Sequence, residues 1–449
     1  MMEAPGITLR CEDCRRAFDE MYPGDFCEAC GGLLNAELVL DPSSAATLRG
    51  RFAERLRDIV RGGADGSGVW RYRELVLPSA ARDEIVTHPE GNTPLLSRAS
   101  VSAWVNVDGL LLKHEGHNPT GSFKDRGMTV AVTQARRGGA AAVACASTGN
   151  TSASLASYAA HAGIPAVVFV PAGYVAMGKL AQTLAYGALT LVVPGNFDDC
   201  LALARRAAAE LDVRLLNSVN PFRVEGQKTI AFEMLQQLDW RAPDWIALPA
   251  GNLGNTSAFG KALREARALG LIDRMPRIAA VQAEGAAPFA RSFAGDFAER
   301  PVVVPDTVAS AIRIGAPASW ARAIGAIRDT NGIVLSVSDA ELLEAKACID
   351  ASGVGCEPAS AASVAGIRSL RRRGVIGAGD TVVAVLTGHL LKDPEVVIEY
   401  HSGTASRRRG ANPPVEIEAT IGAVRDALKR RSLNRDALRG DDLAPDAGA

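Results

Sequence analysis

Short apolar runs alternate with longer stretches of helical composition from about residue 100 onward. The runs are AAVACA (141–146), AVVFV (166–170), LTLVV (189–193), DWIALPA (244–250), RIAAVQ (277–282) and TVVAVL (381–386). They lack the strict alternation of a strand that has one face in water, and Ala-rich stretches separate them. The pattern predicts an α/β fold in which helices cover both faces of parallel sheets.

The first part of the chain follows the helical period instead. In residues 41–60, four apolar residues recur on one face: Leu48, Phe52, Leu56 and Val60. Pro42 follows Asp41 at the start, where helices favour proline, so we expect an amphipathic helix packed on the main body. Near the other end, VEIEATIGAVRDALKRR (415–431) predicts one helix ahead of a polar tail.

Composition narrows the class of protein. With 449 residues, 47% of them hydrophobic, the chain can bury a large core in about two to three domains. The formal net charge of -1 provides no global attraction to nucleic acid or an anionic membrane, so we expect neither as a partner. No basic and apolar leader opens the sequence and no run of about 18 apolar residues occurs, which favours a cytoplasmic protein.

Four cysteines are grouped at the start as CxxC, twelve residues, CxxC: Cys11, Cys14, Cys27 and Cys30. This spacing is typical of two knuckles that share one Zn²⁺, and it predicts a small zinc-ribbon-like lobe with a structural metal. A redox site and a nucleic-acid-binding ribbon are weaker alternatives, the second because basic residues are sparse here. The other cysteines are scattered among apolar residues, unlike a disulfide framework.

Three of the predicted strands run directly into unusual loops: STGNTSAS (147–154), GNLGNTSA (251–258) and TGHLLKDP (387–394). Ligands of open α/β sheets bind beyond the carboxyl ends of strands. GNLGN followed by a helix suits a phosphate, although it is neither a dinucleotide fingerprint nor a nucleotide triphosphate loop. A plain turn is the alternative interpretation of this loop.

A lysine stands inside HNPTGSFKDRG (117–127), behind Gly-Ser-Phe. A lysine with a depressed pKa can bind a carbonyl as a Schiff base, although a lone lysine is usually a surface group. Lys124, the Gly-Asn loop and the Ser-Thr-Gly-Asn-Thr loop together provide what pyridoxal 5'-phosphate needs: an amine, a phosphate cradle and hydrogen-bond donors. We therefore expect this cofactor.

NSVNPFR (217–223) offers a further oxyanion site. The Arg223 guanidinium can bind an oxyanion through two parallel hydrogen bonds, and the Asn and Ser side chains nearby add neutral donors. A turn around Asn220-Pro221 is the alternative interpretation of this segment alone.

These motifs resemble a known family. EGNTPL (90–95), NPTGSFKDRG, ASTGNTSAS and GNLGN are similar to those of the tryptophan-synthase-β-like, fold type II pyridoxal-phosphate enzymes. NSVNPFRVEGQKT, AIRIGAPASW, CEPASAAS and TGHLLKDP resemble threonine synthases, over residues 70–395 in all. The resemblance implies two three-layer α/β/α domains with the active site in the cleft. The predicted parts are a lobe (1–45), a large cofactor domain (46–135 and 233–410), a smaller substrate domain (136–232) and a C-terminal helix and tail (411–449).

The resemblance also implies residue roles. Lys124 would bind the cofactor aldehyde with Phe123 against the ring, Asn150 the phenolic oxygen and Thr387 the ring nitrogen. The cofactor phosphate would lie on the backbone of Gly251, Asn252, Leu253, Gly254 and Asn255. The substrate carboxylate would contact Ser147, Thr148, Asn150 and Thr151, and a substrate phosphate would contact Asn217, Ser218 and Arg223.

The activity implied is the conversion of O-phospho-L-homoserine and water to L-threonine and phosphate by a homodimer. Alternatives are a cysteate-synthase-like enzyme acting on O-phosphoserine, a threonine or serine dehydratase, and a non-catalytic protein that has kept the fold. The family usually has TGHGLKDP, so Leu390 marks a departure near the site. We interpret His114, His117 and His389 as hydrogen-bonded structural histidines rather than catalysts.

Overall fold

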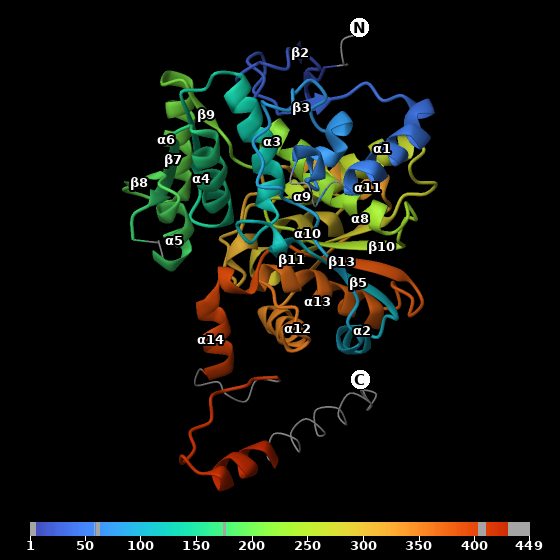
Figure 1. Cartoon of the computed structure of the whole chain (residues 1–449), viewed down its shortest axis with the longest axis vertical. Coiled ribbons are helices and arrows are strands. Elements are labelled where there is room, and N and C mark those ends of the chain that lie inside the picture. The colour runs from blue at the N-terminus through green and yellow to red at the C-terminus, as the bar shows by residue number, and fades with distance from the viewer. Residues whose placement is uncertain (1–5, 58, 60–62, 174–176, 403–409, 430–449) are drawn as a thin grey trace. The chain divides into compact units, whose positions relative to one another are not determined.

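The computed structural model describes residues 6–57, 59, 63–173, 177–402 and 410–429 (Figure 1). The described strands form three sheets, with the orders β2-β1-β3, β12-β11-β10-β13-β5-β4 and β8-β7-β6-β9. The chain divides into two compact units, 1–393 and 394–449, and all three sheets belong to the first. None of the helices formed by the described residues is both long and apolar enough to cross a bilayer.

The six-stranded sheet is the centre of the first unit. Its strands are β12 (Ile333–Val337), β11 (Arg277–Ala283), β10 (Trp245–Pro249), β13 (Thr381–Leu386), β5 (Gly109–His114) and β4 (Leu95–Leu96). Every pair is parallel except β4 with β5. The carboxyl ends of β5, β10 and β13 therefore meet at one edge, where the predicted loops begin.

Helices cover both faces of this sheet, as predicted (Figure 1). On one face α13 (Pro358–Arg372) packs on β10, β11 and β13, with α12 (Asp339–Ala351) and α2 (Ala99–Val105) beside it. On the other lie α8 (Thr229–Gln237), α9 (Gly254–Ala268) and α11 (Trp320–Asp329). Apolar strands such as β10, buried at every position, fit this three-layer arrangement.

The four-stranded parallel sheet comprises β8 (Leu189–Val193), β7 (Ala166–Pro171), β6 (Ala142–Ala146) and β9 (Val213–Leu215). Both α4 (Asn150–Ala162) and α6 (Phe197–Glu210) pack on β6 and β7. The prediction that every apolar run is covered was wrong for β8, where Leu189 and Val192 are 59% and 64% exposed. β8 is an edge strand, which the apolar run could not reveal.

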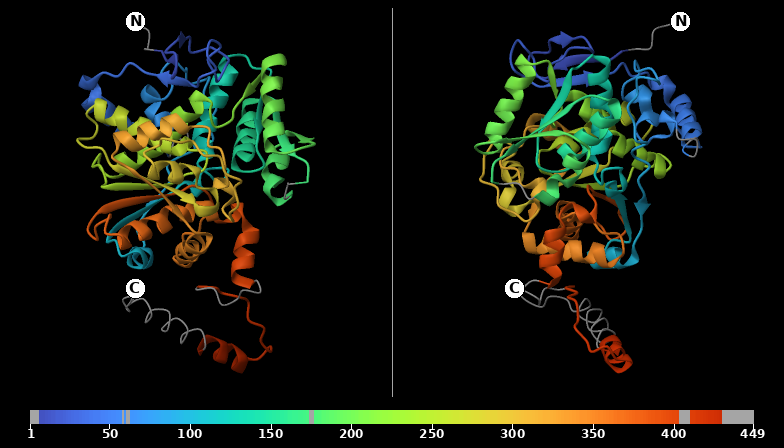
Figure 2. Two further views of the ribbon diagram at one scale, coloured as in Figure 1. Left: turned by 180° about the vertical axis from the view of Figure 1, so that it is seen from behind. Right: turned by 60° about the vertical axis from the view of Figure 1, so that its left-hand side comes forward.

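The N-terminal lobe is a small antiparallel sheet of β1 (Thr8–Cys11), β2 (Ala17–Phe18) and β3 (Leu34–Glu37), seen at the N-terminal end of the chain in Figure 2. Asp41 then caps a turn of 3-10 helix, Pro42–Ser44, that leads into α1 (Ala45–Arg57). Leu48 and Phe52 are buried as predicted, but Leu56 is exposed because the buried stripe ends with Phe52 and Arg55. Val60 lies outside the described residues.

The first unit also contains α3 (Lys124–Arg137), α5 (Met177–Ala185), α7 (Pro221–Gln227) and α10 (Pro288–Ala294), with 3-10 turns at Ala64–Gly66, Trp70–Leu75, Glu115–His117, Glu284–Ala286, Ser310–Ile312 and Leu390–Lys392. The second unit begins with α14 (Pro394–Ser402). The helix predicted at 415–431 begins only at 421, because the Thr420 hydroxyl accepts the N–H of Ala423 as a cap. The predicted domain boundaries stay predictions.

Candidate active site

Lys124 is the first residue of α3, directly behind the loop 121–123. This loop pairs with segment 387–389, which follows β13: Phe123 N donates to Thr387 O at 3.0 Å, and an isolated bridge joins the two segments. Backbone pairing thus brings Lys124 and Thr387 together, although they are far apart in sequence.

The amine of Lys124 lies in surroundings that disfavour its charge. Its Nζ is 4.0 Å from the centre of the Phe123 ring, and its side chain is half-buried. Burial and the positive charge of Arg223 lower the pKa of Lys124 to about 7, while the carboxylate of Glu357 acts in the opposite direction. A large fraction of this amine is therefore unprotonated near neutral pH, as a nucleophile or base requires.

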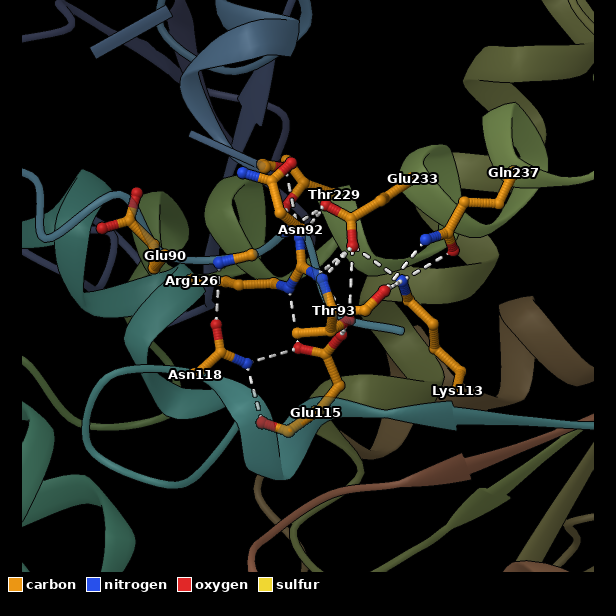
Figure 3. A network of polar contacts seen from close by, with 12 residues as sticks. Glu90, Asn92, Thr93, Lys113, Glu115, Asn118, Arg126, Thr229, Glu233 and Gln237 are labelled. Atoms are coloured by element: carbon orange, nitrogen blue, oxygen red, sulfur yellow. Dashed lines mark hydrogen bonds and ion pairs between the residues drawn. The ribbon is translucent and has the colours of Figure 1, made fainter. Parts of the chain in front are cut away.

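A buried network of charges supports α3 immediately behind Lys124 (Figure 3). Arg126 donates to Glu115 at 2.7 Å and to Glu233 at 2.8 Å, and Lys113 donates to the same Glu233 oxygen at 2.6 Å. Although burial opposes ionisation, these cations hold the pKa of Glu233 well below its ordinary value. The network fixes the helix that presents Lys124, and we assign it no chemistry.

The loop after β10 has the form of an anion site. Leu253 has a left-handed backbone (φ 64°), and α9 begins at the next residue with its N–H groups exposed to the loop. Among the described residues, both polar atoms of the buried Asn255 amide lack a partner, as do the hydroxyls of Thr256 and Ser319. Ser319 precedes α11, and its N–H donates to the Asn252 carbonyl of the loop at 3.3 Å. Buried unpaired polar groups are rare, so three such atoms in the first turn of α9 and a fourth on Ser319 fit a bound phosphate.

Asn252 joins this loop to two other motifs. Its side-chain nitrogen donates to Ser218 Oγ at 2.5 Å, and its oxygen accepts the N–H of Ala318 at 2.6 Å. The motifs NSVNPFR and AIRIGAPASW therefore converge on GNLGN.

Arg223 lies at the start of α7 and is fully buried. Its Nη1 donates to the Leu216 carbonyl at 3.1 Å, whereas Nε and Nη2 have no partner among the described residues. Burial lowers its pKa to about 10, so the guanidinium stays charged at neutral pH. The Asn217 side chain makes two hydrogen bonds with the backbone of Ala146: its oxygen accepts the N–H at 3.0 Å, and its nitrogen donates to the carbonyl at 3.1 Å. These bonds hold the end of β6.

The four residues predicted to receive a carboxylate lie where β6 runs into α4. Ser147 Oγ accepts the N–H of Gly149 at 3.2 Å, and Asn150 and Thr151 open the helix. Together with Thr148 they are half-buried, so their polar atoms can meet a small ligand.

Glu357 has no role predicted from the sequence, although it lies in the motif CEPASAAS. The Glu357 carboxylate accepts from Asn150 Nδ2 at 2.8 Å and from Thr387 Oγ1 at 2.9 Å, so it bridges two predicted cofactor contacts. Burial raises the pKa of Glu357 against the effect of these hydrogen bonds. Gly388 must lack a side chain here, since a Cβ would overlap this carboxylate.

Leu390 and the nearby histidines take structural positions. The Leu390 side chain lies beside Gly355, whose left-handed backbone (φ 71°) favours glycine. His114 bonds the Gly355 carbonyl at 2.7 Å, and His389 accepts the N–H of Leu391 at 3.2 Å, as expected of structural histidines. His117 contacts the His114 ring edge-on.

The four cysteines of the lobe meet at one point. Cys11 Sγ lies 3.4 Å from Cys30 Sγ, Cys14 Sγ lies 3.6 Å from Cys27 Sγ, and all four sulfurs lie within 4.8 Å of one another. Tetrahedral zinc with bonds of about 2.3 Å separates its sulfur ligands by about 3.8 Å, so the cluster can hold a metal of that kind.

Comparison with known proteins agrees with the fold. Residues 86–388 match the family of pyridoxal-phosphate dependent enzymes. The chain belongs to this family.

Close relatives narrow the family. A threonine synthase of Methanosarcina acetivorans is 46% identical over 94% of this chain and 98% of its own length. One of Methanocaldococcus jannaschii is 42% identical over 94% of this chain and 100% of its own. The chain is thus a member of the threonine synthase family. The crystal structure of threonine synthase from Escherichia coli shares the fold (TM-score 0.66, 19% identity, 94% of this chain and 100% of that one).

Proposed function

We propose that this chain converts O-phospho-L-homoserine and water to L-threonine and phosphate, with pyridoxal 5'-phosphate as cofactor. The observation that carries the proposal is Arg223, a buried guanidinium with two unpaired nitrogens whose charge acts on Lys124. Such a group suits a phosphate dianion. With the start of α9, the site has two phosphate positions, one for the substrate and one for the cofactor, as a phosphorylated amino acid on this cofactor requires.

The residues present fit the cofactor. The unpaired amide of Asn255 and the unpaired hydroxyls of Thr256 and Ser319 suit its phosphate. Lys124, whose pKa of about 7 leaves much of the amine neutral, suits its aldehyde. The remaining contacts that we propose are Phe123 against the ring, Asn150 at the phenolic oxygen, Thr387 at the ring nitrogen, and the backbone of Gly251, Asn252, Leu253 and Gly254 at the phosphate. When bound, the cofactor supplies an electron sink for negative charge at the substrate Cα.

The substrate carboxylate would lie at the start of α4, where Ser147, Thr148, Asn150 and Thr151 add donors to a positive helix end. Its phosphate would lie on Arg223 and Ser218, with Asn217 positioning the end of β6. Asn217 still has a second N–H hydrogen for the phosphate, since an amide carries two.

Lys124 would act as the general base. Its Nζ takes the α proton and then a β proton, and phosphate leaves from Cγ. A proton returns to Cγ, water adds its hydroxyl group at Cβ and gives its other proton to the phosphate, and a proton returns to Cα, which completes threonine. A neutral hydroxyl at the ring nitrogen, Thr387, favours this elimination chemistry over transamination.

The alternative substrates differ in one feature each. A dehydratase acts on a substrate whose leaving group is a hydroxyl, so it needs no second phosphate position. The two unpaired nitrogens of Arg223 therefore favour a phosphorylated substrate over that of a dehydratase. O-phosphoserine is one methylene shorter, a difference worth about 1 to 3 kcal/mol in a pocket, and it remains the rival to test.

The test is phosphate release by the cofactor-loaded enzyme from O-phosphohomoserine and, separately, O-phosphoserine, with the amino-acid product identified. We expect threonine from the first substrate alone, and no product from Lys124→Ala. Phosphate release from O-phosphoserine alone, or from neither substrate, would contradict the proposal.

We also propose that Cys11, Cys14, Cys27 and Cys30 hold one structural Zn²⁺, because their sulfurs can surround a tetrahedral ion. Metal analysis should give one zinc per chain, lost in Cys14→Ser. The homodimer and the cytoplasmic location stay predictions, which sedimentation and cell fractionation can check.

A further inference from the structure

The orientation of Arg223 depends on the first turn of α7. The side-chain oxygen of Asn220 accepts the backbone N–H of Arg223 at 3.2 Å and caps this helix. Since two of the three guanidinium nitrogens have no partner, the cap and the bond to Leu216 fix where the guanidinium points.

Asn220 is held in turn by the N-terminal lobe. Its side-chain nitrogen donates to Asp25 Oδ1 at 2.8 Å, and the second oxygen, Asp25 Oδ2, is buried with no hydrogen-bond partner in the part of the chain that the structure describes. A buried oxygen without a hydrogen-bond partner lowers the stability of the fold. Anchoring of the lobe alone is therefore a weak explanation for an aspartate at position 25.

The position of Asp25 follows from the cysteine cluster. Asp25 lies two residues before Cys27, and its carbonyl accepts the N–H of Leu34 at 3.3 Å. Arg322 of α11 anchors the same lobe, donating to Glu12 at 2.6 Å and to the Leu34 carbonyl at 2.7 Å. The lobe is therefore tied both to the body of the protein and to the start of α7.

The charge of Asp25 opposes a direct role in anion binding. In its ionised form the Asp25 carboxylate offsets part of the positive charge of Arg223 that a phosphate would meet. Any benefit of Asp25 to phosphate binding must therefore come from geometry.

We propose that Asp25 is a positioning residue for the substrate phosphate. The four-cysteine lobe, through Asp25 and Asn220, holds the start of α7 so that the free edge of Arg223 faces the phosphate. This gives the lobe a part in substrate binding, and it rests on the proposed role of Arg223.

The experiment titrates the cofactor-loaded enzyme with inorganic phosphate by calorimetry and measures kcat and KM for O-phosphohomoserine. Asp25→Ala removes the acceptor for Asn220, so we expect phosphate to bind about tenfold more weakly, the scale of one buried hydrogen bond, and KM to rise while kcat changes little. Asp25→Asn keeps an oxygen for Asn220 without the charge and should bind phosphate at least as tightly as the wild type. Equal weakening in both variants would overturn the proposal.

Glu20→Ala is the matched control, since it weakens lobe docking at Arg137, which donates to Glu20 at 2.7 Å, without touching Asn220. It should lower the melting temperature but leave phosphate affinity unchanged. If phosphate affinity falls as much in this control as in Asp25→Ala, Asp25 has only a structural role. If Asp25→Ala does not fold, Asn220→Ser tests the same link, because serine still caps α7 but cannot reach Asp25 as a donor amide.

Arg223→Gln separates this inference from the proposed function. If Arg223→Gln abolishes phosphate binding and Asp25→Ala does not weaken it, only the role of Asp25 is wrong. If Arg223→Gln binds phosphate like the wild type, the proposed role of Arg223 fails first.

Discussion

Lys124 is an amine held where its charged form is disfavoured, and this has a measurable cost in the cofactor-free protein. Its pKa is about 7 in the folded state against an ordinary 10.5, so between these values the unfolded chain binds more protons. Stability therefore rises with pH across this window, and the cost of the buried ammonium is largest below pH 7. Lys124→Met should stabilise the cofactor-free protein there, on the order of 1 to 2 kcal/mol after allowance for solvent screening.

Urea unfolding of the cofactor-free protein at about pH 6 and about pH 10 checks this, because the gain should shrink towards the higher pH. Lys228→Met is the matched control. Although burial opposes its charge, Glu225 and Glu265 raise the pKa of Lys228, so removal of this amine should destabilise the protein. A loss of stability in Lys124→Met at low pH would contradict the expectation.

Glu357 acts on the pKa of Lys124 in the direction opposite to burial and Arg223. Its carboxylate favours the ammonium form of Lys124, so Glu357→Gln should lower the pKa of that amine further. Uptake of pyridoxal 5'-phosphate by cofactor-free protein needs the neutral amine, and its half-maximal rate should shift to lower pH in the variant. Asp329→Asn, which alters only a surface pair with Arg264, should leave the profile in place. If the pH profile of cofactor uptake does not shift in Glu357→Gln, Glu357 does not influence the pKa of Lys124.

At the scale of elements, the start of α9 carries polar atoms that are unpaired without a ligand. Asn255→Ala removes a buried amide that has no partner, so cofactor-free protein should lose little stability, whereas cofactor affinity should fall about tenfold. The rise in melting temperature on adding the cofactor should therefore be smaller than in the wild type. Ser257→Ala, whose hydroxyl already bonds the Leu253 carbonyl at 2.8 Å, should keep the full rise.

The sequence predicted those features that depend on nearby residues in the chain. It did not predict the features that depend on contacts with residues remote in sequence. The strand DWIALPA and its GNLGN loop carry their own signals: the apolar run predicted a buried strand, and WIALP is buried at every position, while the loop opens a helix. The exposure of β8 depends on the order of strands in its sheet, which an apolar run does not encode. Glu357 was missed for the same reason, because its place is set by the pairing of its backbone with Gly388.

At the scale of the first unit, Glu233 of α8 joins four segments that are remote in sequence. Figure 3 shows three of these partners, Thr93, Lys113 and Arg126. The Glu233 oxygens accept from Arg71 at 3.3 Å, Lys113 at 2.6 Å, Arg126 at 2.8 Å and the Thr93 N–H at 2.9 Å. One carboxylate thus compensates three buried cations, with Glu115 as the second acid on Arg126. Loss of its charge leaves cations buried without a partner, which is among the most costly changes a core can suffer.

Glu233→Gln should therefore lower the free energy of unfolding by about 3 to 5 kcal/mol at neutral pH, measured from urea midpoints. Glu210→Gln, in an exposed pair with Arg206, should change it by less than about 1 kcal/mol. Because the pKa of Glu233 lies well below its ordinary 4.5, its contribution is present above that value and is lost as the pH falls through the folded pKa. The gap between wild type and Glu233→Gln should narrow in acid, and a gap independent of pH would show that packing, rather than charge, is what Glu233 supplies to α3 and Lys124.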